Sequence, residues 1–262
     1  MSLDTVTFDF WNTLFSDGGT AFEVLSARRC SLLLGALEDS GLKPSESEVQ
    51  QAYRAGFSRY LEAWQQGIHY GAAEQTAFVF ELFQVRPAAE LLTDTVRAVE
   101  EAGVDLPIQP TAGAREIVAL LSGLDFKLGV VSDTGLTPGR ILREFLAREG
   151  MLDFFVSLTF SDETGFTKPD PRMFRRTLAP LGSLPQRAAH VGDRPGTDIA
   201  GALAVGMYAI RYAAVEDHPE PPLAHAVITQ LRELPAALAE VTCTSRLTGL
   251  PASRSEGGQC PP

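Results

Sequence analysis

The chain has 262 residues, 45% of them hydrophobic, which is enough for one large domain or for a core domain with an inserted one. A formal net charge of -11 and a pI near 4.9 argue against a nucleic-acid-binding surface, which would need a basic stripe, and against adhesion to anionic membranes. Cys30, Cys243 and Cys260 are too few and too scattered for a disulfide framework or a zinc cluster, so we expect a reducing compartment. Asp4 and Asp9 interrupt the first ten residues, unlike a signal peptide, and no 18-residue apolar run is present. We therefore predict a cytoplasmic protein that spans no membrane.

The first part of the chain predicts one strand followed by helices. Residues 4–9 read as a buried strand, and 20–41 have helical periodicity that stops at Gly41, a suitable C-terminal cap. Ser45 and Glu48 form a capping-box pattern ahead of an amphipathic stripe. That stripe comprises Val49, Ala52, Tyr53, Phe57, Tyr60, Leu61 and Trp64. Its aromatic residues are read as packing between helices, with an apolar or aromatic substrate as the alternative if part of the stripe lines a cleft.

Two more helices are expected near 73–84 and 87–103, before prolines and a glycine break the pattern over 104–113. After that break, strands alternate with helices. Strands are expected at 127–132, 154–160, 188–192 and 207–212, and helices around 117–121 and at 138–149, 171–181 and 197–205. Such alternation predicts an α/β fold with a doubly wound parallel sheet, Rossmann-like, into which an α-helical domain is inserted.

These patterns predict three parts of the chain. Residues 1–17 and 105–242 form the α/β core, with a last helix at 229–241, and 18–104 form the inserted helical domain. The tail, 243–262, is rich in Gly, Ser and Pro and is expected to be disordered.

Polar residues follow the predicted strands at the edge where α/β sheets bind ligands. Asp9 ends the first strand, Ser132 ends the second, and Lys168 lies in the loop after the third. Asp193 follows the fourth strand, with Asp198 five residues later. Asp9 and Asp193 could share a hard cation such as Mg²⁺, which prefers oxygen ligands, and Lys168 could help to neutralise a phosphoryl group.

The same arrangement suggests a covalent reaction. Ser132 and the backbone N–H groups of Phe10 and Asp133 could donate hydrogen bonds to phosphoryl oxygens, which makes these residues candidate substrate contacts together with Trp11 and Lys168. Asp9 would then be the nucleophile. No role is evident for the Asp133 side chain, and Arg194 could face either the site or solvent.

Four motifs in this order resemble those of the haloacid dehalogenase-like hydrolase superfamily, with a helical cap after the first strand. They are "FDFWNTL" with Asp9, "GVVSDTG" with Ser132, "TKPDP" with Lys168, and "VGDRPGTDIAGA" with Asp193 and Asp198. The resemblance implies that Mg²⁺ is bound by Asp9, by the backbone carbonyl of Trp11 and by Asp193, with Asp198 orienting these ligands. It also implies hydrolysis of a small phosphorylated metabolite through a phosphoaspartate.

Trp11 departs from the family pattern, because phosphatases of this family usually carry a second Asp at that position, which serves as general acid and base. An indole has only an N–H donor and can do neither. Since general acid–base catalysis contributes about 10²–10⁴-fold, we expect slow turnover of esters with poor leaving groups.

Each residue also has a purely structural alternative. Asp9 could be a turn former, Trp11 a core residue, Ser132 a helix cap and Lys168 a solvated charge, while "GDRPGTD" could be a turn with a helix cap. His190, in an apolar strand, is expected to be a hydrogen-bonded core histidine, and His218 has no partner spacing.

Three other functions remain open at this stage. One is haloacid dehalogenation, in which the aspartate attacks a halogen-bearing carbon and an aromatic residue occupies the position of Trp11. The others are carbon–phosphorus cleavage, for which no clear cap lysine is found, and a catalytically weak phosphate-binding regulatory protein. A monomer and a homodimer are equally compatible with the sequence.

Overall fold

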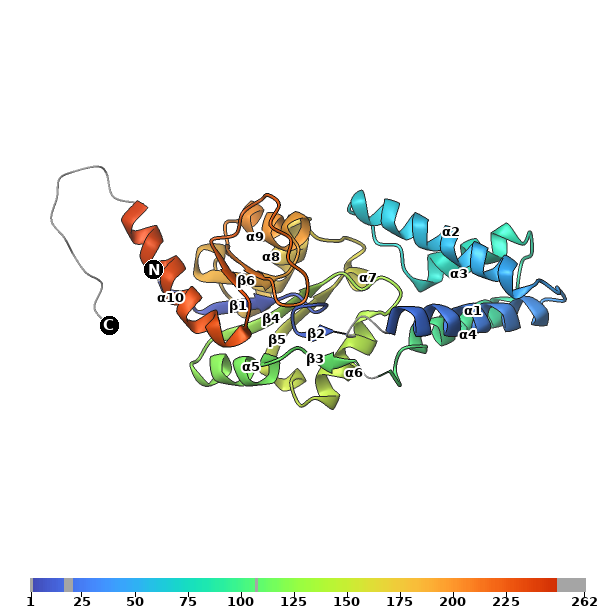
Figure 1. Ribbon diagram of the computed structural model, residues 1–262, viewed down its shortest axis with the longest axis horizontal. Helices are drawn as coiled ribbons and strands as arrows, with labels where there is room; N and C mark the ends of the chain where they lie inside the picture. Colours follow the sequence, from blue (N-terminus) through green and yellow to red (C-terminus); the bar gives the residue numbers. More distant parts are fainter. Residues whose placement is uncertain (1, 17–20, 107, 249–262) are drawn as a thin grey trace.

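A computed structural model describes residues 2–16, 21–106 and 108–248 (Figure 1). Its centre is a six-stranded sheet in the order β5-β4-β1-β6-β7-β8, and every pairing in it is parallel. The strands are β1 (Thr5–Phe8), β4 (Lys127–Ser132), β5 (Phe155–Phe160), β6 (Ala188–Gly192), β7 (Tyr208–Tyr212) and β8 (Ala226–Ile228). The predicted doubly wound parallel sheet is therefore confirmed, whereas β8 was not anticipated.

The register of β1 brings the predicted site residues to one edge of the sheet. β1 lies between β4 and β6, and Phe8 is level with Val130 on one side and Val191 on the other. Asp9, Ser132 and Asp193 follow these three residues by one or two positions. Neighbouring parallel strands thus deliver them to the same carboxyl-terminal edge.

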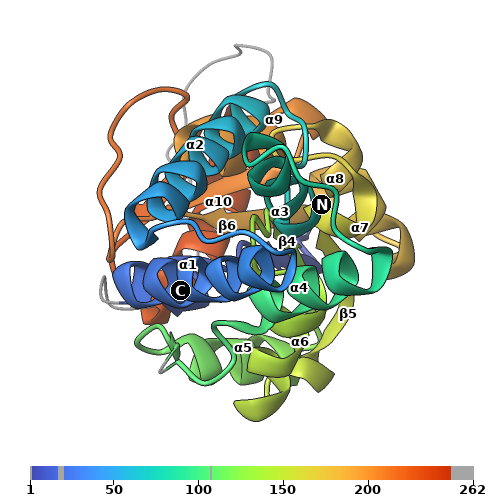
Figure 2. The same cartoon turned by 90° about the vertical axis from the view of Figure 1, so that its right-hand side faces the viewer.

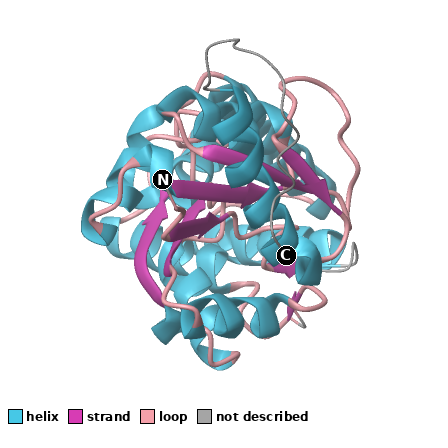
Figure 3. Cartoon of the chain, turned by 90° about the vertical axis from the view of Figure 1, so that its left-hand side faces the viewer, coloured by secondary structure: helices cyan, strands magenta, loops and turns pink. Residues whose placement is uncertain are grey.

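Helices cover both faces of the sheet, as Figures 1 and 3 show. One face packs against α5 (Ala114–Gly123), α6 (Gly139–Arg148) and α10 (Leu234–Thr248). The other face packs against α8 (Pro171–Leu181) and α9 (Ala200–Val205). Consecutive residues of a strand point to opposite faces, so Val130 belongs to the first apolar cluster and Val131 to the second.

Four helices form a separate bundle beside the sheet (Figures 1 and 2). They are α1 (Ala21–Asp39), α2 (Glu46–Gln65), α3 (Ala72–Leu82) and α4 (Ala89–Glu101). The bundle has its own apolar core, which includes Leu37, Tyr53 and Val79. α2 begins with the predicted capping box, in which the Ser45 N–H donates to Glu48 Oε2 over 2.7 Å and the Ser45 hydroxyl accepts from the Glu48 N–H over 3.3 Å.

The chain enters and leaves this bundle through two short strands that lie side by side. β2 (Phe15–Ser16) and β3 (Gln109–Pro110) pair in antiparallel fashion. The Thr111 N–H donates to the Leu14 carbonyl over 2.9 Å directly after this pair. Pro110, one of the two prolines that predicted only a break, therefore lies in a strand of a small second sheet, where a missing N–H is tolerated.

Three details differ from the predicted elements. The helix expected at 197–205 is divided into a π-helical turn, Pro195–Ile199, and α9. A short helix, α7 (Ser161–Thr164), follows β5. α10 continues to Thr248, so the prediction of disorder from residue 243 is wrong for 243–248, because the first helix breakers of that region are Gly249 and Pro251. The rest of the predicted tail, 249–262, lies outside the described residues.

Within the described part of the chain, no helix is long and apolar enough to cross a bilayer.

Candidate active site

The ammonium group of Lys168 lies at the centre of the site. Its Nζ donates to Asp9 Oδ1 over 2.5 Å and to Asp198 Oδ1 over 2.6 Å, and only 3% of the residue is exposed. Burial alone would lower the pKa of Lys168, but the charges of Asp198, Asp9 and Asp133 outweigh it and hold that pKa above its usual value. Lys168 is therefore charged and buried, and the alternative of a solvated loop charge is wrong.

Asp198 uses both of its carboxylate oxygens inside the protein. Oδ1 accepts from Lys168 and lies 3.2 Å from His190 Nε2, while Oδ2 accepts from the Arg194 N–H over 3.1 Å. Although burial opposes it, the neighbouring Lys168 and His190 lower the pKa of Asp198, which is therefore ionised. Gly192 makes room for this side chain, since a Cβ at position 192 would lie 2.4 Å from Asp198 Cγ.

His190 is the buried, hydrogen-bonded core histidine that its strand predicts. Burial lowers its pKa, so the ring is neutral. With a carboxylate on Nε2, the proton belongs on that nitrogen, and Nδ1 accepts from the Thr7 hydroxyl over 2.9 Å. The ring orients Asp198 and is not among the groups of side chains that could hold a metal in the described chain.

Asp193 has a buried oxygen without a hydrogen bond. Its Oδ2 has no hydrogen-bond partner, although the residue is only 2% exposed, and the nearest cation is Arg194 Nε at 3.9 Å. Burial, followed by the charge of Asp198, raises the pKa of Asp193 to about 6. Burial likewise raises the pKa of Asp9, against the opposing effect of Lys168. Both pKa shifts arise mainly from burial, and the neighbouring carboxylates add to it.

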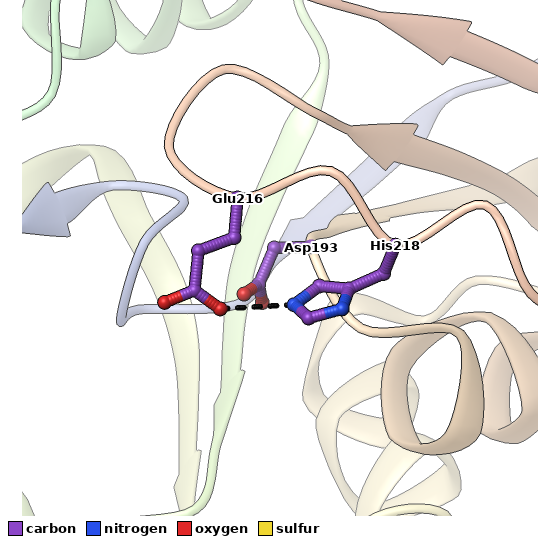
Figure 4. Close-up of side chains that lie close together, drawn as sticks. All are labelled: Asp193, Glu216 and His218. Carbon is purple, nitrogen blue, oxygen red and sulfur yellow. Dashed lines mark hydrogen bonds and ion pairs between the residues drawn. The ribbon is translucent and has the colours of Figure 1, made fainter.

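The donor set fits a hard divalent cation. Asp9, Asp193 and Asp198 each place a carboxylate oxygen within 4.8 Å of the others. Carboxylate oxygens are the ligands that Mg²⁺ prefers, and the unpartnered Asp193 oxygen is the kind of atom that a cation satisfies. The Asp193 carboxylate also faces a second pair of side chains, Glu216 and His218, on the loop after β7 (Figure 4). His218 Nε2 lies 2.9 Å from Glu216 Oε2, a contact between loop residues that no sequence pattern predicted.

The Asp133 side chain joins three parts of the site, although no role could be predicted for it. Oδ2 accepts from Trp64 Nε1 over 2.8 Å, and Oδ1 accepts from the Lys168 N–H over 2.9 Å. It thereby connects α2 with the loop after β4 and with the loop that carries Lys168. No sequence signal could have identified this contact, because Trp64 lies 69 positions away.

Phe10 and Ser132 do not bring their side chains into the cavity. The Phe10 ring is buried and stacks on Phe15 with centroids 4.7 Å apart, so only its backbone is available for the predicted contact. The Ser132 hydroxyl is fully buried and donates to the Asp133 carbonyl over 3.3 Å. Ser132 does not cap a helix, since the residue preceding α6 is Pro138.

A cavity of about 280 Å³ opens above these groups. Its core side includes Asp9, Trp11, Asp133, Lys168, Asp193, Arg194 and Asp198, and its α2 side consists of Phe57, Tyr60, Leu61 and Trp64. Trp11 both lines the cavity and packs edge-on against Phe10, with ring centroids 5.1 Å apart. The interpretation of the α2 stripe as packing alone is thus correct for Tyr53, which lies in the bundle core, and wrong for the residues from Phe57 to Trp64.

Comparison with known proteins gives one consistent family. Residues 3–206 match the model of the haloacid dehalogenase-like hydrolases. A glyceraldehyde 3-phosphate phosphatase of Methanothermobacter thermautotrophicus is 28% identical over 208 residues, which cover 79% of this chain and 84% of the relative.

Two solved structures extend this comparison. A 2-haloacid dehalogenase from Pseudomonas syringae has a TM-score of 0.69 at 25% identity and covers 91% of this chain and 99% of its own. A phosphatase of the same superfamily from Thermococcus onnurineus has a TM-score of 0.62 at 24% identity, with coverages of 91% and 98%, and shows the shared fold. The solved structures of similar fold thus include one that is named a phosphatase and one that is named a dehalogenase.

Replacement of Lys168 tests the charge balance of the site. Lys168→Met removes the one ammonium that contacts Asp9 and Asp198, and we expect a loss of about 3–5 kcal/mol in the free energy of unfolding, because buried carboxylates lose their partner. Urea denaturation in the presence of EDTA measures this loss. The matched control is Lys43→Met at an exposed lysine, and an equal stability of both variants would contradict the assigned role.

Proposed function

The chain belongs to the haloacid dehalogenase-like hydrolases, and on this premise we propose that it is a Mg²⁺-dependent phosphatase that acts through an aspartyl phosphate on Asp9. The main support is the excess of buried acid, since Asp9, Asp193 and Asp198 share a single buried ammonium. Transfer of a phosphoryl group benefits from a cation that neutralises charge on both protein and substrate. In this proposal residues 1–17 and 105–242 are the catalytic core, and residues 18–104 are a cap over it.

Three residues would hold the metal. The Asp9 carboxylate, the backbone carbonyl of Trp11 and the unpartnered oxygen of Asp193 are the proposed ligands. Asp198 is proposed to orient them, because both of its oxygens already accept hydrogen bonds from Lys168, His190 and the Arg194 N–H. Bound Mg²⁺ would supply positive charge beside the nucleophile and the phosphoryl oxygens.

The chemistry would proceed in two displacements on phosphorus. A carboxylate oxygen of Asp9 attacks phosphorus, and the bond to the ester oxygen breaks, so that the alcohol leaves with the electron pair and takes a proton from solvent. Water then attacks the phosphorus of the aspartyl phosphate, releases inorganic phosphate, gives up a proton and restores the Asp9 carboxylate. Lys168, and the N–H groups of Phe10 and Asp133, would neutralise or hydrogen-bond the phosphoryl oxygens, and Ser132 would assist them after turning from the Asp133 carbonyl.

A second candidate is haloacid dehalogenation, which the aromatic residue at position 11 and the similarity to the Pseudomonas syringae dehalogenase favour. Attack of one carboxylate on carbon does not require the additional acids Asp193 and Asp198. Halide release from haloacetates that continues in EDTA would support this candidate against the phosphatase.

The direct test of the proposal is a screen of phosphorylated metabolites with Mg²⁺. We expect release of phosphate that stops in EDTA and falls to background in Asp9→Asn, a nearly isosteric variant without the nucleophilic carboxylate. Phosphate release by Asp9→Asn at the rate of the unmodified protein would refute the proposed nucleophile.

Metal binding can be tested without turnover. We expect Mg²⁺ at about a hundred times its Kd to raise the Tm by roughly 5–10 °C. Asp193→Asn should lose this shift, yet its Tm in EDTA should equal or exceed that of the unmodified protein, because a neutral amide replaces a buried carboxylate whose Oδ2 has no hydrogen-bond partner. Differential scanning fluorimetry measures both effects, with Asp94→Asn at an exposed position as the control. An unchanged Mg²⁺ shift in Asp193→Asn would exclude Asp193 as a ligand.

Because Trp11 supplies no general acid, we expect the rate of hydrolysis to depend on the acidity of the leaving group. The unmodified protein should hydrolyse aryl phosphates much faster than alkyl phosphates, since a phenolate leaves without a general acid. Trp11→Asp should raise kcat for an alkyl phosphate by about 10²-fold or more and change kcat for an aryl phosphate less. Trp11→Phe controls for the loss of indole packing on Phe10, and the Tm of each variant reports folding. Equal efficiency of the unmodified protein on both ester classes would refute this explanation.

A further inference from the structure

We propose that the α2 side of the cavity, formed by Phe57, Tyr60, Leu61 and Trp64 and here called the apolar ceiling, binds the aromatic ring of a phenolic phosphate monoester and selects against a second charge on the substrate. The inference rests on the proposed phosphatase function. It adds the chemical class of the leaving group of the substrate, which is a phenol.

The ceiling offers no charge to a substrate. Among the described residues that line the cavity, α2 contributes two aromatic rings without ionisable groups, one leucine and one tyrosine. Burial raises the pKa of Tyr60 to about 12, so its hydroxyl stays neutral. A carboxylate or a second phosphate on the leaving group would therefore lose its hydration without gaining a partner from α2.

The polar atom of Trp64 is already in use. Its Nε1 donates to Asp133 over 2.8 Å, and the Arg194 guanidinium lies 5.8 Å from the centroid of its ring. The hydrogen bond fixes the orientation of the indole and leaves it to interact with a substrate through its apolar surface. Phe57 and Tyr60 extend this surface, with ring centroids 5.6 Å apart. Flat, oriented aromatic surfaces of this kind favour another ring through offset or edge contacts.

The cations of the cavity lie on the core side. Lys168 contacts Asp9 and Asp198 and is directed to the phosphoryl position. Arg194 is half-exposed and lies within 4 Å of carboxylate oxygens of Asp193 and Glu216. The positive charge of the cavity thus comes from core residues, and α2 itself contributes only apolar or neutral groups.

The cavity has room for a phosphoryl group and a single six-membered ring. Position 11 leads to the same class by an independent argument, since Trp11 provides no acid and a phenolate needs none.

Binding of two phosphonates tests the ceiling without any hydrolysis. We expect phenylphosphonate to bind in the presence of Mg²⁺ at least about tenfold more tightly than methylphosphonate, as measured by isothermal titration calorimetry. Phe57→Ala should lose most of this difference and leave the Kd of methylphosphonate unchanged. Equal affinities of the unmodified protein for the two phosphonates would overturn the proposal.

A positive charge introduced on the ceiling tests the proposed selection against a second charge on the substrate. Leu61 lines the cavity but is 40% exposed, so Leu61→Lys should fold. We expect this variant to raise kcat/KM for 4-carboxyphenyl phosphate relative to phenyl phosphate at least about tenfold, chiefly through KM. These esters share a phenolic leaving group, so leaving-group acidity contributes little. Leu32→Lys, at a leucine of α1 that is 37% exposed and does not line the cavity, should leave the ratio unchanged. A ratio in Leu61→Lys like that of the unmodified protein would contradict the selection.

The proposed substrate class and the proposed phosphatase activity can be refuted independently of each other. Tighter binding of phenylphosphonate without hydrolysis of any ester supports the ceiling and overturns the phosphatase. Hydrolysis of glyceraldehyde 3-phosphate or phosphoserine in preference to phenyl phosphate supports the phosphatase and overturns the inferred substrate class.

Discussion

The contact of one buried ammonium with two buried carboxylates is the constraint on which the rest of the site depends. Lys168 reaches Asp9 and Asp198 only because the loop after α7 folds over the ends of β1 and β6. Removing these charges from water is costly, and their mutual contacts repay that cost only in a narrow geometry. The parallel register of β1 with β4 and β6 therefore also determines how these charged side chains meet. A one-residue slip of β1 would turn Asp9 toward the opposite face of the sheet and away from Lys168.

The helical bundle is connected to this centre through the loop that follows β4. The buried guanidinium of Arg29 on α1 donates to the Leu136 carbonyl and the Thr137 hydroxyl of that loop, over 3.4 and 3.1 Å. At the start of the same loop, Asp133 accepts from Trp64 on α2 and from the Lys168 N–H. A displacement of α2 would therefore disturb Asp133, and with it the backbone that carries Lys168. The ceiling and Lys168 are therefore coupled through one side chain, since Asp133 accepts a hydrogen bond from each at a different carboxylate oxygen.

Patterns local in sequence predicted most of the fold and the core side of the site, and long-range contacts account for what they missed. Asp9, Lys168, Asp193 and Asp198 could be identified because parallel strands place their carboxyl ends together, and the sheet does so here. The role of Asp133 depends on Trp64, and the position of His218 depends on the path of the loop after β7, neither of which has a periodic signal. The α2 stripe was ambiguous for a geometric reason. An amphipathic helix between two parts of a protein can show one end of its apolar face to a core and the other end to a cavity, as Tyr53 and Trp64 do.

The distribution of charge also explains how an acidic cavity could serve an anionic substrate. Among the described residues, the cavity is lined by the four carboxyl groups of Asp9, Asp133, Asp193 and Asp198 but by only two cationic side chains, Lys168 and Arg194. An anion that enters without a cation therefore meets net repulsion. A divalent cation removes this repulsion only at the base of the cavity, because the acids that can bind it lie there. The ceiling contributes no charge, and any preference among substrates must then come from shape and apolar contact with the part of the molecule that faces α2. In the proposed phosphatase, recognition of the phosphate would therefore be electrostatic, and recognition of the leaving group would be hydrophobic and physically separate from it. Substitutions on α2 could therefore change the substrate preference of such an enzyme and leave the buried charges at the base of the cavity unaltered.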